Sequence, residues 1–254
     1  MLGWLFDKLK GGNTLYYPGC MTKFALKDKQ EKYEKLLKKL GIEYIKLPDV
    51  ELCCGIPVLN AGYVEDFEEL KKKNLEIFKE YDVKKIITNC PGCCHTLKNE
   101  YGLDAEHITQ VLARNIDKVE NWKQETVEAR ENLGKPWKLE NRGNRENLKT
   151  VDITYHDPCH LGRWGGIFGE PREVLKKKGF TVKELDYSRS ESLCCGGGGG
   201  LRQNDKNAAS KVACNVLNQV KTKKLVTACP MCFYHLRENA KDVEVLDYID
   251  AVEE

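Results

Sequence analysis

The chain has 254 residues, of which 12 are cysteines, and its 41 basic and 39 acidic side chains leave a formal net charge of only +2. This balance of charge gives no sign of a nucleic-acid surface. A mean hydropathy of −0.55, without an apolar run of roughly 18–20 residues, excludes an integral membrane protein. The length suits one large domain or two domains of about 100–125 residues.

Residues 1–13 form an N-terminal segment in which Asp7, Lys8 and Lys10 interrupt the apolar side chains. Charge inside the apolar stretch is unlike a signal peptide, so we expect a cytoplasmic protein. In that reducing compartment, cysteines serve more often as metal ligands or redox groups than as disulfides. The segment could pack on the core, dock on a partner protein or lie on a membrane.

The residues that follow predict the same order of elements twice, in half-domains over 14–119 and 149–254. Strand patterns fall at 15–17, 42–47 and 85–88, and again at 151–155, 180–185 and 224–227. Helix patterns fall at 28–40, 64–81, 171–178 and 206–220, and a last helix begins after each third strand. Strands that alternate with helices in this way form parallel β-α-β units. The predicted fold is α/β, with two pseudo-symmetric half-domains that each hold a small, mainly parallel sheet flanked by helices.

Residues 120–148 break this pattern and predict a connection between the half-domains. Of these 29 residues 12 are charged, six of each sign, and Gly134, Pro136 and Gly143 interrupt them. We expect the connection to be helical at first and then an exposed loop. Trp122 and Trp137 leave a role in partner docking open.

Ten of the twelve cysteines repeat with matched spacing in the two halves. Each half has a single cysteine, then Cys-Cys-Gly, then Cys-Pro-x-Cys, with spacers of 32 and 34 residues in the first half and of 34 and 32 in the second. Cys94 and Cys214 are left over. Such a repeat indicates a duplicated half-domain.

The three cysteine groups of each half follow the carboxyl ends of predicted strands, where ligands collect in parallel sheets. We therefore expect five thiolates on one rim of each half. Thiolates select zinc, copper(I) or iron–sulfur clusters. A structural zinc site needs four ligands and leaves the fifth cysteine unexplained, whereas adjacent cysteines can reach different irons of a larger core. The glycine after each pair permits close backbone approach. A zinc-binding interaction module stays as a minor alternative.

At this point the sequence resembles a known family, the cysteine-rich CCG-domain proteins, which include the catalytic subunits of heterodisulfide reductase. The match covers about residues 14–250. It is strengthened by the sequence from His156 to Arg163 and by the stretch 194–200, in which five glycines follow Cys194 and Cys195. These two stretches look most like the C-terminal part of the D-type catalytic subunits, although the repeat also fits the B-type. The ferredoxin-like segment of the D-type is missing from this sequence.

The resemblance implies two [4Fe–4S] clusters of non-cubane type, one per half-domain, at the strand carboxyl ends. The first would be held by Cys20, Cys53, Cys54, Cys90 and Cys93, and the second by Cys159, Cys194, Cys195, Cys229 and Cys232. It further implies a disulfide oxidoreductase, the catalytic iron–sulfur subunit of a heterodisulfide reductase-like complex. The substrate suggested is coenzyme M–coenzyme B heterodisulfide. It would be reduced to two thiols with one electron from each cluster, in a pocket between the halves.

A partner is expected because the sequence has no flavin, nicotinamide or ferredoxin fingerprint. Electrons would come from a subunit that carries ferredoxin-type clusters, flavin or both, and membrane association would run through that partner or through residues 1–13. The alternative function is an electron-transfer subunit that links a flavin dehydrogenase to a quinone.

Residues beside the cluster ligands are the remaining candidates for the site. We expect Cys54 and Cys195 to be the catalytic cysteines, with His156 and His160 either assisting catalysis or making ordinary loop hydrogen bonds. Arg163 and Arg202 are weaker candidates for binding anionic substrate groups.

Four further side chains are expected to have mainly structural roles. His95 and His235 are predicted to be helix-surface residues, and Cys214 a small buried residue within a helix. Cys94 could tune or replace a neighbouring cluster ligand.

Overall fold

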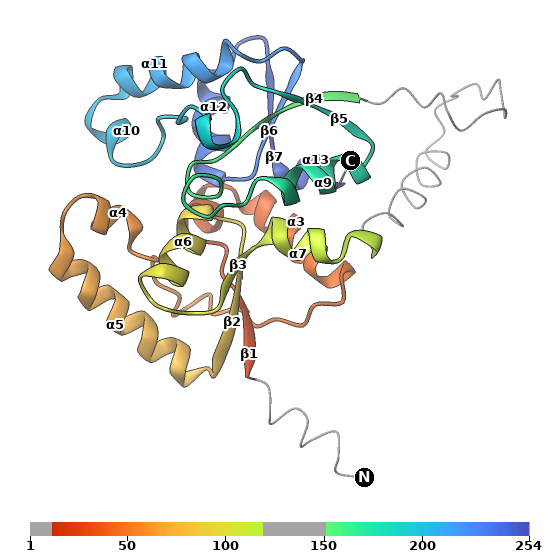
Figure 1. Ribbon diagram of the computed structural model, residues 1–254. Coiled ribbons are helices and arrows are strands. Elements are labelled where there is room, and N and C mark those ends of the chain that lie inside the picture. Colours follow the sequence, from red (N-terminus) through yellow and green to blue (C-terminus); the bar gives the residue numbers. More distant parts are fainter. Residues whose placement is uncertain (1–11, 119–150, 254) are drawn as a thin grey trace.

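The computed structural model describes residues 12–118 and 151–253, and all that follows concerns these two ranges (Figure 1). The predictions for residues 1–11 and for the connection at 120–148, with Trp122 and Trp137, lie outside them. Within the two ranges, no helix is long and apolar enough to cross a membrane.

The first half contains a parallel sheet of three strands in the order β1-β2-β3. Its strands are β1 (Asn13–Tyr16), β2 (Val83–Thr88) and β3 (Ala105–His107). Its helices are α2 (Cys20–Ala25), α3 (Lys27–Lys39), α4 (Ile56–Asn60), α5 (Val64–Glu80), α6 (Pro91–Asn99) and α7 (Ile108–Arg114).

The second half contains a parallel sheet of four strands in the order β5-β4-β6-β7. Its strands are β4 (Val151–His156), β5 (Phe180–Glu184), β6 (Lys224–Thr227) and β7 (Glu244–Asp247). Its helices are α9 (Gly169–Lys177), the 3-10 turn η2 (Arg189–Glu191), α10 (Leu201–Asn204), α11 (Lys206–Leu217), α12 (Pro230–Asn239) and α13 (Tyr248–Glu253).

The two halves repeat one plan, and the predicted α/β fold with parallel sheets flanked by helices is confirmed. In each half the first strand leads into the single cysteine, and a later strand, β2 or β6, leads into Cys-Pro-x-Cys and a helix. The last strand of each half, β3 or β7, is followed by a short helix that closes the half. Figure 1 shows the halves one above the other, with α7 and α9 lying against each other at the boundary.

One predicted strand is wrong in extent, and several elements were not predicted. Residues 42–47 do not form a strand: Ile45 alone bridges to β1, exchanging backbone hydrogen bonds with Thr14 and Tyr16. The unpredicted elements include β3, α7, β7 and α13. The strands among them have only three and four residues, too short for an alternating pattern to show.

Helices form where the apolar side chains repeat at helical spacing. Helix α3 buries Tyr33, Leu36 and Leu37, and α5 buries Phe67 and Phe78, while lysines and glutamates cover their outer faces. The buried stripe of α5 packs beneath the Cys-Cys-Gly loop, so this helix supports the first cysteine set.

A single hydrophobic core joins the halves. It includes Tyr16 and Ile108 from the first half together with Ile153 and Tyr248 from the second. Polar contacts add to it: the Tyr33 hydroxyl donates to Asp247 at 2.7 Å, and both Lys29 and Lys32 pair with Asp250. The halves are therefore packed as one body, and their cysteine sets have a fixed mutual placement.

Candidate functional site

The single cysteine and the Cys-Pro-x-Cys of each half lie where parallel strands end, as predicted, whereas no strand leads into the Cys53–Cys54 loop. Cys20 opens α2 just after β1, Cys90 follows β2 directly, and the Cys53–Cys54 loop precedes α4. In the second half, Cys159 follows β4 and Cys229 follows β6. All twelve cysteines fall within the described ranges, and all are free thiols.

The five thiols of the first half form a connected series. Cys53 interacts with Cys20 and with Cys54, Cys54 with Cys93, and Cys93 with Cys90. Hydrogen bonds from Cys20 and Cys54, helped by the backbone N–H of Gly55, lower the pKa of Cys53 to about 3. The series runs from the exposed Cys20 inward to the buried Cys93, so one end of the set is open to solvent.

The second half repeats this series residue for residue. Cys194 interacts with Cys159 and with Cys195, Cys195 with Cys232, and Cys232 with Cys229. Hydrogen bonds from Cys159 and Cys195 lower the pKa of Cys194 to about 2, whereas the neighbouring Cys194 raises the pKa of Cys195 to about 12. The two sets thus share one pattern of thiol contacts.

Glycines bring the backbone close to the thiols. Gly55 has a φ of 84°, its N–H lies 3.5 Å from the Cys53 sulfur, and a Cβ there would lie 2.7 Å from the ring of Phe67. Gly196 has a φ of 81°, and its N–H lies 3.4 Å from the Cys194 sulfur. A side chain at Gly19 would lie 2.9 Å from the Cys93 sulfur. Only glycine suits these positions.

Five soft donors with backbone N–H groups beside them fit an anionic iron–sulfide core. They could hold such a group in each half, and the glycines leave room for it to approach the chain. Within the described ranges, no three His, Cys, Asp or Glu side chains are grouped to hold a single metal ion.

Side chains from two strands fix the Cys-Cys-Gly loop of the second half. Both ring nitrogens of His156 are used, one by the Thr227 hydroxyl at 3.2 Å and one by the Leu193 carbonyl at 3.0 Å. Burial lowers the pKa of His156 and so favours the neutral ring. This histidine holds the loop, and it has no free nitrogen for a substrate.

Asp157 holds the same loop through its carboxylate and its carbonyl. The carboxylate accepts from the Arg189 N–H at 2.7 Å, and the carbonyl accepts from the Ser192 hydroxyl at 3.1 Å. Two nitrogens of Arg172 each donate to this carboxylate at 2.7 Å, and Arg172 also pairs with Glu184. Both side chains of the Asp157–Arg172 pair are almost fully buried, with exposures of 2% and 4%.

The first half holds its loop with different side chains. The Tyr17 hydroxyl donates to the Leu52 carbonyl at 2.5 Å, the Asn74 amide to the Cys53 carbonyl at 3.0 Å, and the Tyr101 hydroxyl to the Cys54 carbonyl at 3.2 Å. The duplication has therefore kept the thiols while the supporting polar contacts have diverged.

His160 lies at the boundary between the halves. Its Nδ1 is 3.3 Å from the Cys159 sulfur, while its Nε2 is buried without a hydrogen-bond partner among the described residues. Its ring packs on Trp164, with centroids 4.3 Å apart, and on His95 of the first half, with centroids 5.9 Å apart. Burial lowers the pKa of His160.

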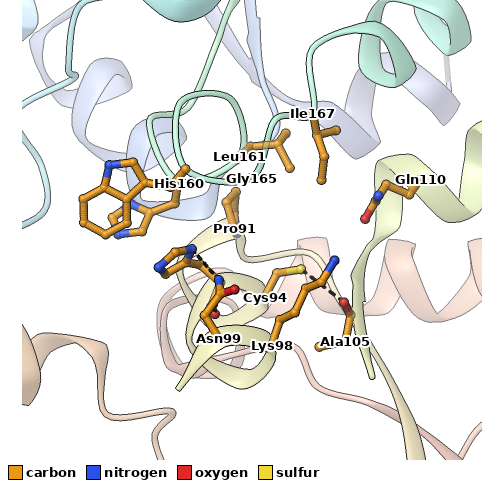
Figure 2. A pocket seen from close by; sticks show the side chains of 12 residues that line it. Pro91, Cys94, Lys98, Asn99, Ala105, Gln110, His160, Leu161, Gly165 and Ile167 are labelled. Carbon is orange, nitrogen blue, oxygen red and sulfur yellow. Dashed lines mark hydrogen bonds between the residues drawn. The ribbon is translucent and has the colours of Figure 1, made fainter. Parts of the chain in front are cut away.

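A cavity of about 100 Å³ opens beside this group of rings. Figure 2 shows Leu161, Gly165 and Ile167 along one wall, Cys94 and Lys98 on the other, and Gln110 at the side. One wall belongs to the second half, and the other to α6 and β3 of the first. The cavity therefore lies between α6, which carries Cys93 and begins directly after Cys90, and the loop that holds Cys159.

The two arginines predicted to bind anions are engaged elsewhere. Arg163 donates to the Ser192 carbonyl. Arg202 pairs with Glu238 at 2.5 Å and lies over the ring of Tyr234. Neither lines the cavity.

Two structural predictions are wrong. His235 is buried, because α12 packs against α11 and the His235 ring bonds to the Ala209 carbonyl. Cys214 is exposed, since α11 buries Ala213 and Val216 and the next position along the helix points about 100° away. His95 is half-buried on α6.

Cys94 is buried, with its sulfur 3.8 Å from the Ala105 carbonyl, and it lines the cavity. Sequence reasoning missed Lys98, Gln110 and Trp164, which line the cavity as well. The repeat itself contained a sign that the two halves differ beside α6, because Cys94 occupies the position that Phe233 occupies in the second half.

Comparison with known proteins identifies the family. The model of the CCG cysteine-rich domain matches twice, at residues 14–98 and 153–237. The chain belongs to this family and carries two copies of its domain. An uncharacterised iron–sulfur protein of Methanocaldococcus jannaschii is 33% identical over 241 residues, which is 92% of this chain and 43% of that protein.

Two further relatives have named activities. The EtfAB:quinone oxidoreductase of Syntrophomonas wolfei is 32% identical, over 91% of this chain and 32% of its own length. One subunit of the dihydromethanophenazine:CoB–CoM heterodisulfide reductase of Methanosarcina acetivorans is also 32% identical, over 93% of this chain and 57% of its own. The chain thus spans between about a third and somewhat over a half of the length of these relatives.

Proposed function

We propose that this chain is the catalytic iron–sulfur part of a disulfide reductase. The observation that carries the proposal is the presence of two complete five-thiol sets in halves that are packed into one body. Membership of the CCG family and similarity to a heterodisulfide reductase subunit support it.

Each set would hold one [4Fe–4S] cluster of non-cubane type. The first would use Cys20, Cys53, Cys54, Cys90 and Cys93, and the second Cys159, Cys194, Cys195, Cys229 and Cys232. Five ligands with adjacent cysteines suit a core in which neighbouring thiolates reach different irons.

The proposed reaction takes one disulfide, two electrons and two protons to two thiols. When bound, each cluster supplies one electron, so the pair matches the two electrons that the S–S bond requires. The chain itself contributes the placement of the two sets, because the shared core fixes them relative to each other. The cavity lies between the two halves, next to residues that adjoin Cys93 and Cys159 in the sequence. The CoB–CoM heterodisulfide is the substrate favoured by the relative's name.

Anaerobic iron and sulfide analysis is the first test. We expect about eight of each per chain, and about four after Cys54→Ala or Cys195→Ala, with loss of viologen-driven disulfide reduction in both variants. The exposed Cys214 gives the matched control, because Cys214→Ala should leave iron content and activity unchanged. Iron content far below eight in the parent protein would refute the two-cluster proposal.

The second candidate function is electron transfer from a flavin dehydrogenase to a quinone, favoured by the similarity to EtfAB:quinone oxidoreductase. The two functions differ in what the isolated protein reduces. Reduction of a disulfide with a viologen dye supports the first, whereas turnover seen only with a quinone and a reduced flavoprotein supports the second. In both cases a partner that carries flavin or ferredoxin-type clusters would deliver the electrons.

A further inference from the structure

The two thiol sets differ in what their single cysteine meets. The Nδ1 of His160 lies 3.3 Å from the Cys159 sulfur. The repeat aligns Cys159-His160 with Cys20-Met21, and a methionine side chain has no hydrogen to donate. Among the described residues, His160 supplies the one side-chain nitrogen that hydrogen-bonds to a sulfur of either set. The second set therefore has a side-chain donor at a position where the first set has none.

The direction of this hydrogen bond follows from the chemistry of the sulfur. A cysteine that binds iron has lost its proton, so the Nδ1 of His160 must carry the hydrogen of the contact with Cys159. The Nε2 of the ring then has no hydrogen to place, in keeping with its burial without a hydrogen-bond partner in the described part of the chain. Trp164 and His95 hold the ring in this orientation, with centroids 4.3 Å and 5.9 Å away.

Backbone donors differ less between the sets. The N–H groups of Gly55 and Gly196 lie 3.5 Å and 3.4 Å from the first sulfur of the Cys-Cys pair that precedes each of them. N–H groups at the start of α6 lie beside the Cys90 sulfur, and α12 begins after Cys229 in the same way, with cysteine as the N-cap and proline next. Within the described ranges, Gly197 adds one donor in the second set alone, 3.4 Å from the second sulfur of its pair.

Charge and solvent access also enter the reduction potential of an iron–sulfur group. The repeat aligns Glu51 of the first half with Ser192 of the second, two residues before each Cys-Cys pair. Arg163 donates to the Ser192 carbonyl, whereas Lys23 offsets only part of the effect of a carboxylate at Glu51. Each set leaves one cysteine exposed, so solvent access does not separate them. The side chains around the second set are thus the more favourable to an added electron.

A hydrogen bond to a thiolate draws electron density from the sulfur and stabilises the reduced, more negative state of the iron–sulfur group. We propose that His160 acts through Cys159 to give the second set a higher reduction potential than the first, so that the first electron to arrive rests in the second half. The proposal rests on the proposed pair of clusters and deepens it. Each step adds one electron, delivered by the flavin- or ferredoxin-type partner, and the two sets are filled in a fixed order.

The test is an anaerobic redox titration of the iron-loaded protein, followed by electron paramagnetic resonance without substrate. Cys195→Ala keeps the first cluster and Cys54→Ala keeps the second, so these variants assign the two signals of the parent protein. We expect the second cluster to be half-reduced at the higher potential. In the parent background, His160→Phe should lower that potential by about 59 mV, which is a tenfold change in the ratio of reduced to oxidised cluster for one electron. The potential of the first cluster should stay unchanged.

His160→Asn is the rescue variant, because the asparagine N–H can replace the Nδ1–H, and it should keep most of the parent potential. His95→Phe is the matched control: its ring packs on His160, and it has no hydrogen bond to a sulfur among the described residues, so neither potential should move. Unchanged iron and sulfide contents show that the variants keep their clusters.

Equal or reversed potentials of the two clusters, or a second potential that His160→Phe leaves in place, overturn the proposal. A shift in His95→Phe as large as that in His160→Phe also overturns it, since the packing of the rings would then set the potential. The expected order of potentials in a protein that reduces no disulfide would leave the role of His160 standing and refute the proposed function instead.

Discussion

At the scale of single residues, the buried Asp157–Arg172 pair decides the geometry of the second thiol set. Asp157 lies two residues before Cys159, and its backbone and carboxylate also hold Ser192 and Arg189, next to the Cys194–Cys195 loop. Arg172 donates to the Phe168 carbonyl as well. One ion pair therefore ties β4 and α9 to the loop that carries two of the five thiols.

We predict that Arg172→Met destabilises the protein by about 3–5 kcal/mol, because it leaves the Asp157 carboxylate buried and without its cation. For a chain of this size, the loss corresponds to a fall of roughly 6–20 °C in the thermal unfolding midpoint. Circular dichroism under anaerobic conditions measures it. The variant should also lose iron from the second site before the first.

The control for this charge pair is Lys221→Met, which removes an exposed pair with Asp186 that contributes at most about 1 kcal/mol. Adding Asp157→Asn to Arg172→Met should restore part of the lost stability, since the stranded charge is then gone. A fall of only about 1–2 °C for Arg172→Met would show that water reaches the carboxylate and that the pair does not hold the loop.

At the scale of elements, the turn from the Cys-Cys-Gly loop into α4 depends on the helix beneath it. Gly55 has a φ of 84°, and a Cβ there would lie 2.7 Å from Phe67 of α5, which is itself buried. Two independent requirements, a left-handed backbone and the absence of a side chain, thus meet at the residue that follows Cys54.

Gly55→Ala is therefore expected to lower the stability of the protein by more than the left-handed backbone conformation alone explains. The left-handed conformation costs about 1–2 kcal/mol for alanine, and the contact with Phe67 adds to that cost. Gly62 gives the matched comparison, because its φ is 87° and a Cβ there meets no atom within 4 Å. Thermal midpoints and iron content measure both variants. Equal losses in Gly55→Ala and Gly62→Ala would show that the contact with α5 is unimportant.

Sequence patterns identified the elements whose signals are long or chemical. The stripe of α5 and the cysteine spacing were sufficient to predict the helix, the parallel sheets and the position of the thiols at the strand ends. The sequence of residues 42–47 predicts a strand, yet only Ile45 pairs with β1, and a single bridge makes no strand. The polar partners of His156 and the cavity at Cys94 come from residues far apart in sequence, and their contacts could not be predicted from spacing.

At the scale of the whole molecule, the two halves are joined by buried polar groups as well as by the apolar core. Asp247, at the end of β7, accepts a hydrogen bond from Tyr33 of the first half, and its exposure is 1%. Burial raises the pKa of Asp247 to about 6, against the opposing effects of the Tyr33 hydroxyl and the Ile249 N–H. Asp250 raises this pKa further, and Lys29 lowers it.

This raised pKa makes the joined structure sensitive to pH. Between about pH 4 and 6, the folded chain keeps the proton on Asp247 while the unfolded chain releases it. The folded state then binds more protons, so stability falls as the pH rises through this window and levels off above it. A shift of about two pKa units corresponds to about 3 kcal/mol over the full window, of which roughly 1 kcal/mol lies between pH 5 and 7.5.

Asp247→Asn should remove this contribution, because asparagine keeps an oxygen for Tyr33 and has no proton to lose. Thermal midpoints measured anaerobically at pH 5 and pH 7.5 should therefore differ less in the variant than in the parent protein, by roughly 2–4 °C. Asp242→Asn is the control, since Asp242 is exposed just before β7, and it should keep the parent's dependence on pH. If Asp247→Asn and the parent protein change equally between the two pH values, Asp247 is ionised throughout, and the joint between the halves holds a charge that Tyr33 and Lys29 must stabilise.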